Sequence, residues 1–358
     1  MPINIRHIRL HNQHLLASKF KDPVEVVKSL VAVQAQDYYG AKWALAQRTV
    51  ASSDDDVEKA FADGRILRLH IMRPTWHFVA REDIRWLLQL TAPRINAVSA
   101  HAYRQKGLDQ SIFKRTHRAL TKALRGGREL TRAELRLVLE RAGIDPGDSI
   151  CLGYIMIRAE LDGVVCSGAR RGNQFTYALL DERAPKSRML EPDEALAELT
   201  ERYFLTRGPA TVKDFVWWSG LTVGQAKRGL DLVDRSLKND LVETKIYFSG
   251  SKTTKPPDLA KRAHLLPAYD EYFISYKDRS AGMHPKFNQK TTASKLIFDA
   301  PLVIEGVVVG GWNRVVESKV VRINLKPFYQ LNRAERNSVM QAVDRFAKFL
   351  GKDVSVNW

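Results

Sequence analysis

The chain has 358 residues, of which 44% are hydrophobic, as expected for a globular protein with a sizeable core and more than one domain. Its 57 Lys and Arg residues against 40 Asp and Glu residues give a formal net charge of +17, which favours an anionic partner, nucleic acid ahead of anionic lipid. Cys151 and Cys166 are too few for a disulfide framework or a structural zinc site. No segment has the pattern of a membrane span or a signal peptide, so we expect a cytoplasmic, nucleoid-associated protein without a membrane partner.

The first third of the chain opens with a predicted helix over residues 22–36. Asp22 and Glu25 form its capping box, with Pro23 at the first helical position. Gln34 occupies a position on the apolar stripe where leucine would be expected. The elements that follow are a helix at 41–48, the segment 54–64, and strands at 65–72 and 75–80.

Two later regions share the order helix, turn, helix and strand. The first has helices at 132–143 and 151–161, then two strands at 164–168 and 173–180 joined by the basic turn ARRG. The second has helices at 212–218 and 223–233 and one strand at 241–250. This order is that of a winged helix, although each unit alone is also compatible with a plain helical hairpin. We predict three tandem winged helices.

The C-terminal third begins with a linker at 251–258 that is rich in Lys, Thr and Pro. Short apolar segments at 295–312 and 319–325 and one amphipathic helix at 333–350 follow, which predicts a small antiparallel sheet or barrel closed by a helix. The fold class is therefore α+β. The predicted domains are a first winged helix at 1–110, a second at 111–190, a third at 191–252, and a β-barrel with a C-terminal helix at 253–358.

Few residues of the sequence suggest catalysis or the binding of a cofactor. The chain has no Gly-rich phosphate loop, no metal-binding His pair and no nucleophile motif, so we expect neither cofactor nor metal. Gln34 and Gln36 would point about 200° apart on a continuing helix, but an extended step would bring both amides to one side. An amide pair can hold a water molecule and stabilise positive charge, although it cannot act as a general base. The alternative is that both glutamines only bond the backbone at a helix end.

Three further stretches carry polar and aromatic residues. RPTWHF at 73–78 is either a wing that contacts phosphate or a core hairpin. LLPAYDEYFISYKDRS at 265–280 has paired carboxylates among tyrosines and is also compatible with a structural turn bearing surface ion pairs. In GVVVGGWNR at 306–314, Trp312 could stack on a base or fill a barrel.

Together, LVAVQAQDYYGAKWALAQR and these three stretches resemble, in order, the winged-helix DNA-binding proteins that include the DNA glycosylases AlkZ and YcaQ. The resemblance implies three winged helices arranged as a C, a C-terminal β-barrel and a concave face that binds DNA. It also implies that Gln34 and Gln36 position the water and support the sugar cation. Gln at both positions is nearer the AlkZ type than the YcaQ type, which has Asp at the second.

From the resemblance we expect a monofunctional, metal-independent DNA glycosylase that hydrolyses the N-glycosidic bond of N-alkylated purines, with interstrand crosslinks as a further substrate class. The expected partner is lesion-containing double-stranded DNA, bound by a monomer. The alternative is a non-catalytic DNA-binding or regulatory protein. The candidate catalytic residues are Gln34, Gln36 and, in reserve, Asp37. The candidate DNA-binding residues are Arg73, Thr75, His77, Arg170, Arg171, Tyr269, Asp270, Arg279 and Trp312.

Overall fold

The computed structural model describes residues 3–251, 262–284 and 299–358. The chain divides into two compact units. Unit 1 comprises Met1–Glu58, Ala197–Trp218 and Thr222–Trp358, and unit 2 comprises Lys59–Leu196 with Ser219–Leu221. All but the first residue of the linker predicted at 251–258 lies outside the described residues, as does the start of the segment predicted at 295–312. No helix in the described part of the chain is long and apolar enough to cross a bilayer.

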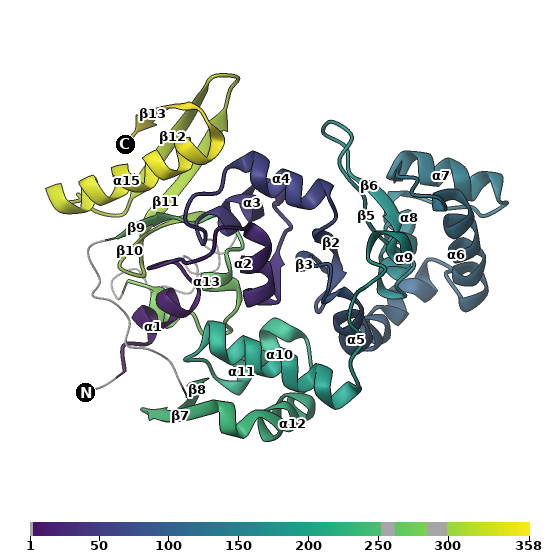
Figure 1. Ribbon diagram of the computed structural model, residues 1–358, viewed down its shortest axis with the longest axis horizontal. Helices are drawn as coiled ribbons and strands as arrows, with labels where there is room; N and C mark the ends of the chain where they lie inside the picture. Colours follow the sequence, from purple (N-terminus) through teal and green to yellow (C-terminus); the bar gives the residue numbers. More distant parts are fainter. Residues whose placement is uncertain (1–2, 252–261, 285–298) are drawn as a thin grey trace. The chain divides into compact units, whose positions relative to one another are not determined.

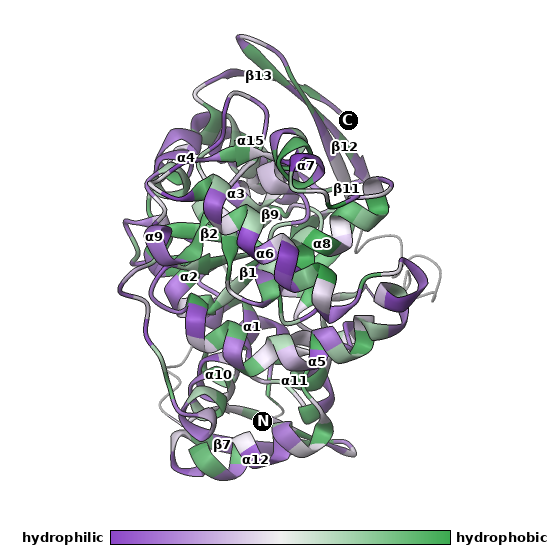
Figure 2. Cartoon of the chain, turned by 90° about the vertical axis from the view of Figure 1, so that its right-hand side faces the viewer, coloured by the Kyte–Doolittle hydropathy of each residue, from purple (hydrophilic) through white to green (hydrophobic). Residues whose placement is uncertain are grey.

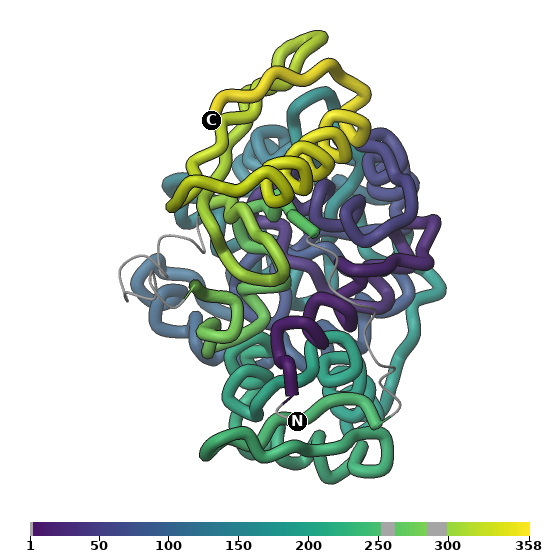
Figure 3. The backbone as a smooth tube through the Cα atoms, turned by 90° about the vertical axis from the view of Figure 1, so that its left-hand side faces the viewer, coloured from purple at the N-terminus to yellow at the C-terminus, as the bar shows by residue number. Residues whose placement is uncertain are grey.

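The C-terminal part of unit 1 is a five-stranded sheet covered by one long helix. The strand order is β13-β12-β11-β10-β9, with β9 and β13 at its two edges, so the sheet is an open, curled half-barrel and not a closed barrel. Neighbouring strands are antiparallel except β12 and β13, which are parallel. Helix α15 contacts β9 and β13, and Figure 3 shows it lying across the sheet. The elements are β9 (Ala263–Leu265), β10 (Ala300–Ile304), β11 (Val307–Val316), β12 (Val320–Pro327), α15 (Arg333–Leu350) and β13 (Asp353–Asn357).

The N-terminal elements of unit 1 differ from the prediction at one important place. Asp22 caps α2 (Pro23–Leu30) as expected, but the helix ends at Leu30, not at residue 36. The chain leaves the helix at Val31, which has φ 66° and ψ −55°, and continues as β1 (Ala32–Gln34). Arg207 stabilises this break, because its guanidinium donates to the carbonyl oxygens of Leu30 at 2.9 Å and Ala32 at 3.0 Å. The other elements here are α1 (Ile5–Asn12), α3 (Tyr38–Ala46) and α4 (Asp54–Ala62).

The helices of the third predicted winged helix are α10 (Pro192–Arg207), α11 (Val212–Ser219) and α12 (Val223–Val233). The capping box between Thr222 and Gln225 opens α12. The single strand predicted at 241–250 is wrong: the chain forms an antiparallel hairpin of β7 (Leu237–Val242) and β8 (Lys245–Gly250). The two strands are joined at Glu243, whose φ of 54° reverses the chain. Such a two-residue turn is easily overlooked where strand-forming residues continue on both sides.

Unit 2 contains the second predicted winged helix and the hairpin of β2 (Ile66–Ile71) and β3 (Thr75–Ala80). Strands β4, β6 and β5 form a three-stranded antiparallel sheet in that order. Buried residues of α6, α7 and α8 make one apolar core with this sheet, and Figure 2 shows polar and apolar residues alternating along α6. The elements are α5 (Ile84–Gln105), α6 (Gln110–Leu124), β4 (Leu130–Thr131), α7 (Arg132–Arg141), α8 (Ser149–Leu161), β5 (Val165–Ser167), β6 (Thr176–Leu179) and α9 (Leu180–Arg183).

Candidate active site

The two glutamines lie on the short non-helical segment between α2 and α3. Gln34 is the last residue of β1 and is 7% exposed, whereas Gln36 is exposed to solvent. Asp37 caps α3, with its Oδ1 accepting from the Gly40 N–H at 3.0 Å. Because α2 ends before this segment, the helical geometry that would separate the two amides does not apply. The extended alternative is thus the one that the backbone adopts at Gln34.

A buried carboxylate holds the backbone of this segment. The Gln34 N–H donates to Oε1 of Glu271 at 2.9 Å. Glu271 is the first residue of α13 (Glu271–Ile274) and is fully buried. Its second oxygen, Oε2, accepts from Ser275 at 2.6 Å, from Arg207 at 2.8 Å and from Trp218 at 3.0 Å. Four residues therefore donate to the carboxylate and fix it, and through it the position of Gln34.

The charge state of Glu271 follows from these contacts. Burial on its own would raise the pKa of this carboxyl, but the Arg207 guanidinium, together with hydrogen bonds from Ser275, Arg207 and the Gln34 N–H, lowers the pKa to about 2. Glu271 is consequently an anion at neutral pH and has no proton to give. Its chemistry is that of an anchor for Gln34.

The side-chain oxygen of Gln34 is buried and accepts no hydrogen bond from the described residues. Leaving a buried polar atom unpaired costs about 1–3 kcal/mol, so a structural role alone does not account for an amide here. A leucine at the same place on the apolar core would avoid this cost. Oε1 of Gln34 is therefore a candidate acceptor for a group that the described residues do not supply.

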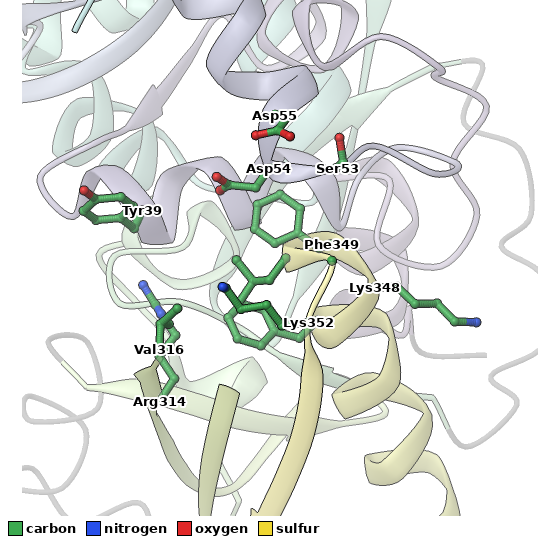
Figure 4. A pocket seen from close by; sticks show the side chains of 12 residues that line it. Tyr39, Ser53, Asp54, Asp55, Arg314, Val316, Lys348, Phe349 and Lys352 are labelled. Atoms are coloured by element: carbon green, nitrogen blue, oxygen red, sulfur yellow. The ribbon is translucent and has the colours of Figure 1, made fainter. Parts of the chain in front are cut away.

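A cavity of about 640 Å³ is lined by Tyr39 of α3 and by residues of α4, β11 and α15. Oδ2 of Asp37 lies 3.8 Å from Nη2 of Arg314, which belongs to β11 and lines this cavity. Figure 4 shows residues from the starts of α3 and α4, among them Tyr39 and Asp54, facing residues from β11 and the end of α15. Tyr39 is 49% exposed, and its ring is therefore available to a flat ligand.

Lys42 sets the charge at the edge of this cavity. It is 1% exposed and donates to Asp54 at 2.8 Å and to Glu58 at 2.8 Å. Asp54 is therefore paired with a buried cation, whereas the neighbouring Asp55 is exposed. The lining of the cavity consequently combines aromatic rings, the two carboxylates Asp54 and Asp55, and cations that include Arg314 and Lys352.

The stretch at 265–280 is largely internal. Asp270 is 2% exposed, and its two oxygens accept from Arg48 at 2.7 and 2.9 Å. Tyr269 is half-buried, with φ 61°. Arg279 is half-buried, donates to the Phe273 carbonyl at 3.0 Å and lies over the Trp217 ring at 5.4 Å. Asp270 is therefore structural, but its ion pair with Arg48 is buried and does not lie on the surface as the alternative stated. Tyr269 and Arg279 retain part of their surface.

Trp312 lies in the interior of the half-barrel. It is 4% exposed, its Nε1 donates to the Leu266 carbonyl at 2.7 Å, and its ring packs edge-on against Phe346 at 5.2 Å. Of the two alternatives for Trp312, the structure shows the one in which the side chain fills the core of the sheet. A base could reach the ring only after the sheet and α15 separated.

In unit 2, the hairpin of β2 and β3 carries the next three candidates. His77 is fully buried, with Nδ1 2.9 Å from the Thr75 carbonyl oxygen. Arg73, in the turn of the hairpin, and Thr75 are half-buried. The hairpin thus has the core character of one alternative at His77, and Oγ1 of Thr75 and Nε and Nη2 of Arg73 are buried as well.

Arg170 and Arg171 stand at the basic turn between β5 and β6. Arg171 is exposed and donates to Glu134 at 2.8 Å and to the Glu129 carbonyl at 2.8 Å. Arg170 is half-buried and lies over the ring of Phe175 at 5.5 Å. Both guanidinium groups are therefore held at the tip of the hairpin by contacts within the protein.

Sequence reasoning missed the residues that hold the site together. Arg48, Arg207 and Lys42 are almost completely buried, and each is paired with a carboxylate. Charged residues are rarely buried, and the carboxylates that bind Arg48 and Arg207 are more than 60 positions away, so no local pattern marks them. Within residues 3–251, 262–284 and 299–358, no group of three or more His, Cys, Asp or Glu side chains is arranged to hold a metal ion.

Comparison with known proteins places these features in a family. A family model described as "DNA glycosylase AlkZ-like" matches residues 27–349. An "Interstrand DNA cross-link repair glycosylase" of Streptomyces sahachiroi is 27% identical over 332 residues, which are 87% of this chain and 88% of that protein. The solved structure of the Streptomyces sahachiroi DNA glycosylase AlkZ is similar to this chain, with a TM-score of 0.79 and 21% sequence identity. The similarity extends over 99% of this chain and 98% of that one, so the two share a fold. The chain belongs to the DNA glycosylase AlkZ-like family.

Proposed function

We propose that the protein is a monofunctional DNA glycosylase that hydrolyses the N-glycosidic bond of N-alkylated purines in lesion-containing double-stranded DNA, as a monomer and without a metal ion. The observation that carries the proposal is the buried, unpaired Oε1 of Gln34 on a backbone fixed by Glu271. In this proposal the oxygen faces the cation that develops on the sugar. The relative named as an interstrand cross-link repair glycosylase supports crosslinked purines as a further substrate class.

The chemistry requires little of the protein. An N3- or N7-alkylated purine already carries positive charge, so the base can depart without a general acid. The oxocarbenium-like sugar needs a nearby negative dipole and a positioned water molecule, and an amide offers both an acceptor and a donor. Gln34 and Gln36 are assigned these two roles. Asp37 remains in reserve, because its carboxylate is engaged by Gly40 and lies close to Arg314.

The DNA is proposed to be held by three winged helices and by basic side chains. Two regions that support this reading have two helices followed by a hairpin, namely α7, α8, β5 and β6, and α11, α12, β7 and β8. The net charge of +17 supplies the long-range attraction to phosphate. Arg73, Thr75, Arg170, Arg171, Tyr269 and Arg279 are the proposed contacts, and the buried His77, Asp270 and Trp312 are proposed to act by positioning their surroundings.

The test is excision from a duplex that contains N7-methylguanine. The protein is incubated with the duplex, which is then heated in alkali so that each abasic site becomes a strand break. We expect breaks with the wild type and none with the Gln34→Ala/Gln36→Ala double variant. Gln341→Ala, an exposed glutamine on α15, is the matched control and should cleave like the wild type. Binding without abasic product over a panel of alkylated bases and a crosslink would overturn the proposal in favour of a non-catalytic DNA-binding protein.

A further inference from the structure

A second cavity in unit 1, of about 530 Å³, is lined by residues of α3, the loop that follows it, β9 and α15. Its apolar wall includes Trp43 and Phe349, whose ring centroids are 5.2 Å apart. This volume and mixed lining are typical of a site for a small organic molecule. It shares Ser53, Lys348 and Phe349 with the cavity lined by Tyr39 and Arg314, but its other lining residues are its own.

Three side chains that line this cavity have buried polar atoms without a hydrogen-bond partner in the described part of the chain. These atoms are Nε2 and Oε1 of Gln47, Oγ of Ser52 and Nε2 of His264. Ser52 is 8% exposed and His264 is 3% exposed. Four unpaired polar atoms around one cavity are unusual, because buried polar groups almost always have partners. They are the donors and acceptors that a polar ligand would satisfy.

The same cavity concentrates positive charge. Arg262, Arg345 and Lys348 line it, and its lining includes no Asp or Glu. Among residues 3–251, 262–284 and 299–358, none of these three cations has a carboxylate within ion-pair distance. Arg345 donates only to the Ala263 carbonyl, at 2.6 Å. Burial, and to a smaller extent the neighbouring Arg262, lowers the pKa of Arg345 to about 10, which reflects mainly the cost of removing its guanidinium from water.

His264 does not add to this charge. Burial, followed by Arg345, Arg262 and Arg48, lowers the pKa of His264 well below its ordinary value, so the ring is neutral at physiological pH. A neutral ring can donate or accept through Nε2. The cavity therefore presents fixed cations at its edge and neutral polar groups beside an aromatic wall.

We propose that this cavity binds a phosphate-bearing ligand. Arg262 and Arg345 would hold the phosphate, because guanidinium groups match its oxygen atoms geometrically. Gln47 and Ser52 would bond the polar part of the ligand, and Trp43 and Phe349 would contact a flat ring. The phosphate belongs either to a free nucleotide or to the DNA backbone. The inference does not depend on the proposed glycosylase activity, since it uses neither Gln34 nor Gln36.

The experiment measures binding to the whole chain by calorimetry and by thermal unfolding, with deoxyadenosine monophosphate, inorganic phosphate and an undamaged DNA duplex as separate probes. We expect saturable binding of one phosphate probe, with an affinity at least tenfold weaker in Arg345→Gln and unchanged in Arg336→Gln. Arg336 lies on the same helix outside the cavity lining, so it matches the loss of charge. If the monophosphate binds tightly, the bound phosphate is that of a free nucleotide. If Arg345→Gln weakens binding of the duplex alone, the bound phosphate is that of the DNA backbone.

Gln47→Leu keeps the proposal testable if Arg345→Gln fails to fold, because it removes two unpaired polar atoms and should not destabilise the protein. It should weaken binding of whichever phosphate probe the wild type binds saturably. The proposal is overturned if no probe binds saturably, or if Arg345→Gln and Arg336→Gln weaken binding equally, since the effect would then be general electrostatics.

Discussion

The main-chain N–H of Gln34 donates to Oε1 of Glu271 at 2.9 Å, across 237 positions of sequence. The other oxygen of the same carboxylate accepts from Arg207, which also caps the end of α2 through the Leu30 carbonyl. One buried ion pair thus fixes both the helix end and the strand that carries the amide. The geometry of the candidate site therefore depends on Glu271 and Arg207.

Glu271→Gln should destabilise the protein strongly. The substitution leaves the fully buried Arg207 without its anion, and breaking a buried ion pair on one side typically costs about 3–5 kcal/mol. Urea unfolding followed by tryptophan fluorescence measures the loss. Glu317→Gln is the control, because Glu317 pairs with Arg322 on the surface and should change the unfolding free energy by less than about 1 kcal/mol. Equal effects of the two variants would contradict the assigned role of Glu271.

Stability should also fall in acid because of Glu271. Its pKa is about 2 in the folded protein and near 4.5 when unfolded, so the unfolded chain takes up a proton first as the pH falls. The contribution of this carboxylate is therefore complete above pH 4.5 and is lost as the pH drops towards 2. The measurement is the difference in unfolding free energy between wild type and Glu271→Gln across this range. A difference that stays constant with pH would show that the carboxyl is not ionised as described.

Gln34→Leu should separate activity from stability. Leucine has a similar size, fills the same apolar surroundings and removes the unpaired Oε1, so the unfolding free energy should stay within about 1 kcal/mol of the wild type or increase. Excision of N7-methylguanine should fall by at least about a hundredfold, the usual effect of losing a group that stabilises developing charge. Substrate binding by the variant, measured on an uncleaved duplex, controls for misfolding. Full activity in Gln34→Leu would exclude this amide from catalysis.

Gly40→Ala should disturb the cap of α3. A Cβ at this position would lie 2.4 Å from Oδ2 of Asp37 and 3.0 Å from Cβ of Pro267, so Asp37 has to move. Loss of an N-cap costs about 0.5–2 kcal/mol, and the displaced segment should also slow excision. Gly224→Ala on α12 is the matched control, since the nearest atom lies 3.9 Å away and alanine favours a helix there. Thermal unfolding and the excision assay on both variants make the comparison.

The sequence predicted those parts of the fold that local patterns determine. The helix expected at 333–350 is α15, residue for residue, because its apolar stripe is continuous and Gly351 terminates it. The helix predicted over 22–36 is wrong beyond Leu30. Arg207 and Glu271, which are remote in the sequence, supply the hydrogen bonds that stabilise the non-helical backbone there. The parallel strand β13 was not predicted for the same reason, because its partner β12 is separated from it in the sequence by α15.

For the candidate site, residue types alone identified Gln34 and Gln36 as unusual and left a helical and an extended backbone open; the structure has the extended one at Gln34. Sequence patterns could not separate Trp312 and Asp270, which are buried, from Arg171, which is exposed. Aromatic and charged residues have similar local signatures on a wing and in a core. Only the long-range contacts decide between these positions.

The bonds that Glu271 and Asp270 make to the N-terminal segments affect how the protein is assembled during its synthesis. Arg48 and the strand that ends at Gln34 are synthesised early, yet both carboxylates that bind them emerge from the ribosome more than 200 residues later. A nascent chain therefore carries its two glutamines in an unfinished setting for most of translation. The order of synthesis delays assembly of the site until the last quarter of the polypeptide is available, so fragments that stop before residue 270 lack the means to form it.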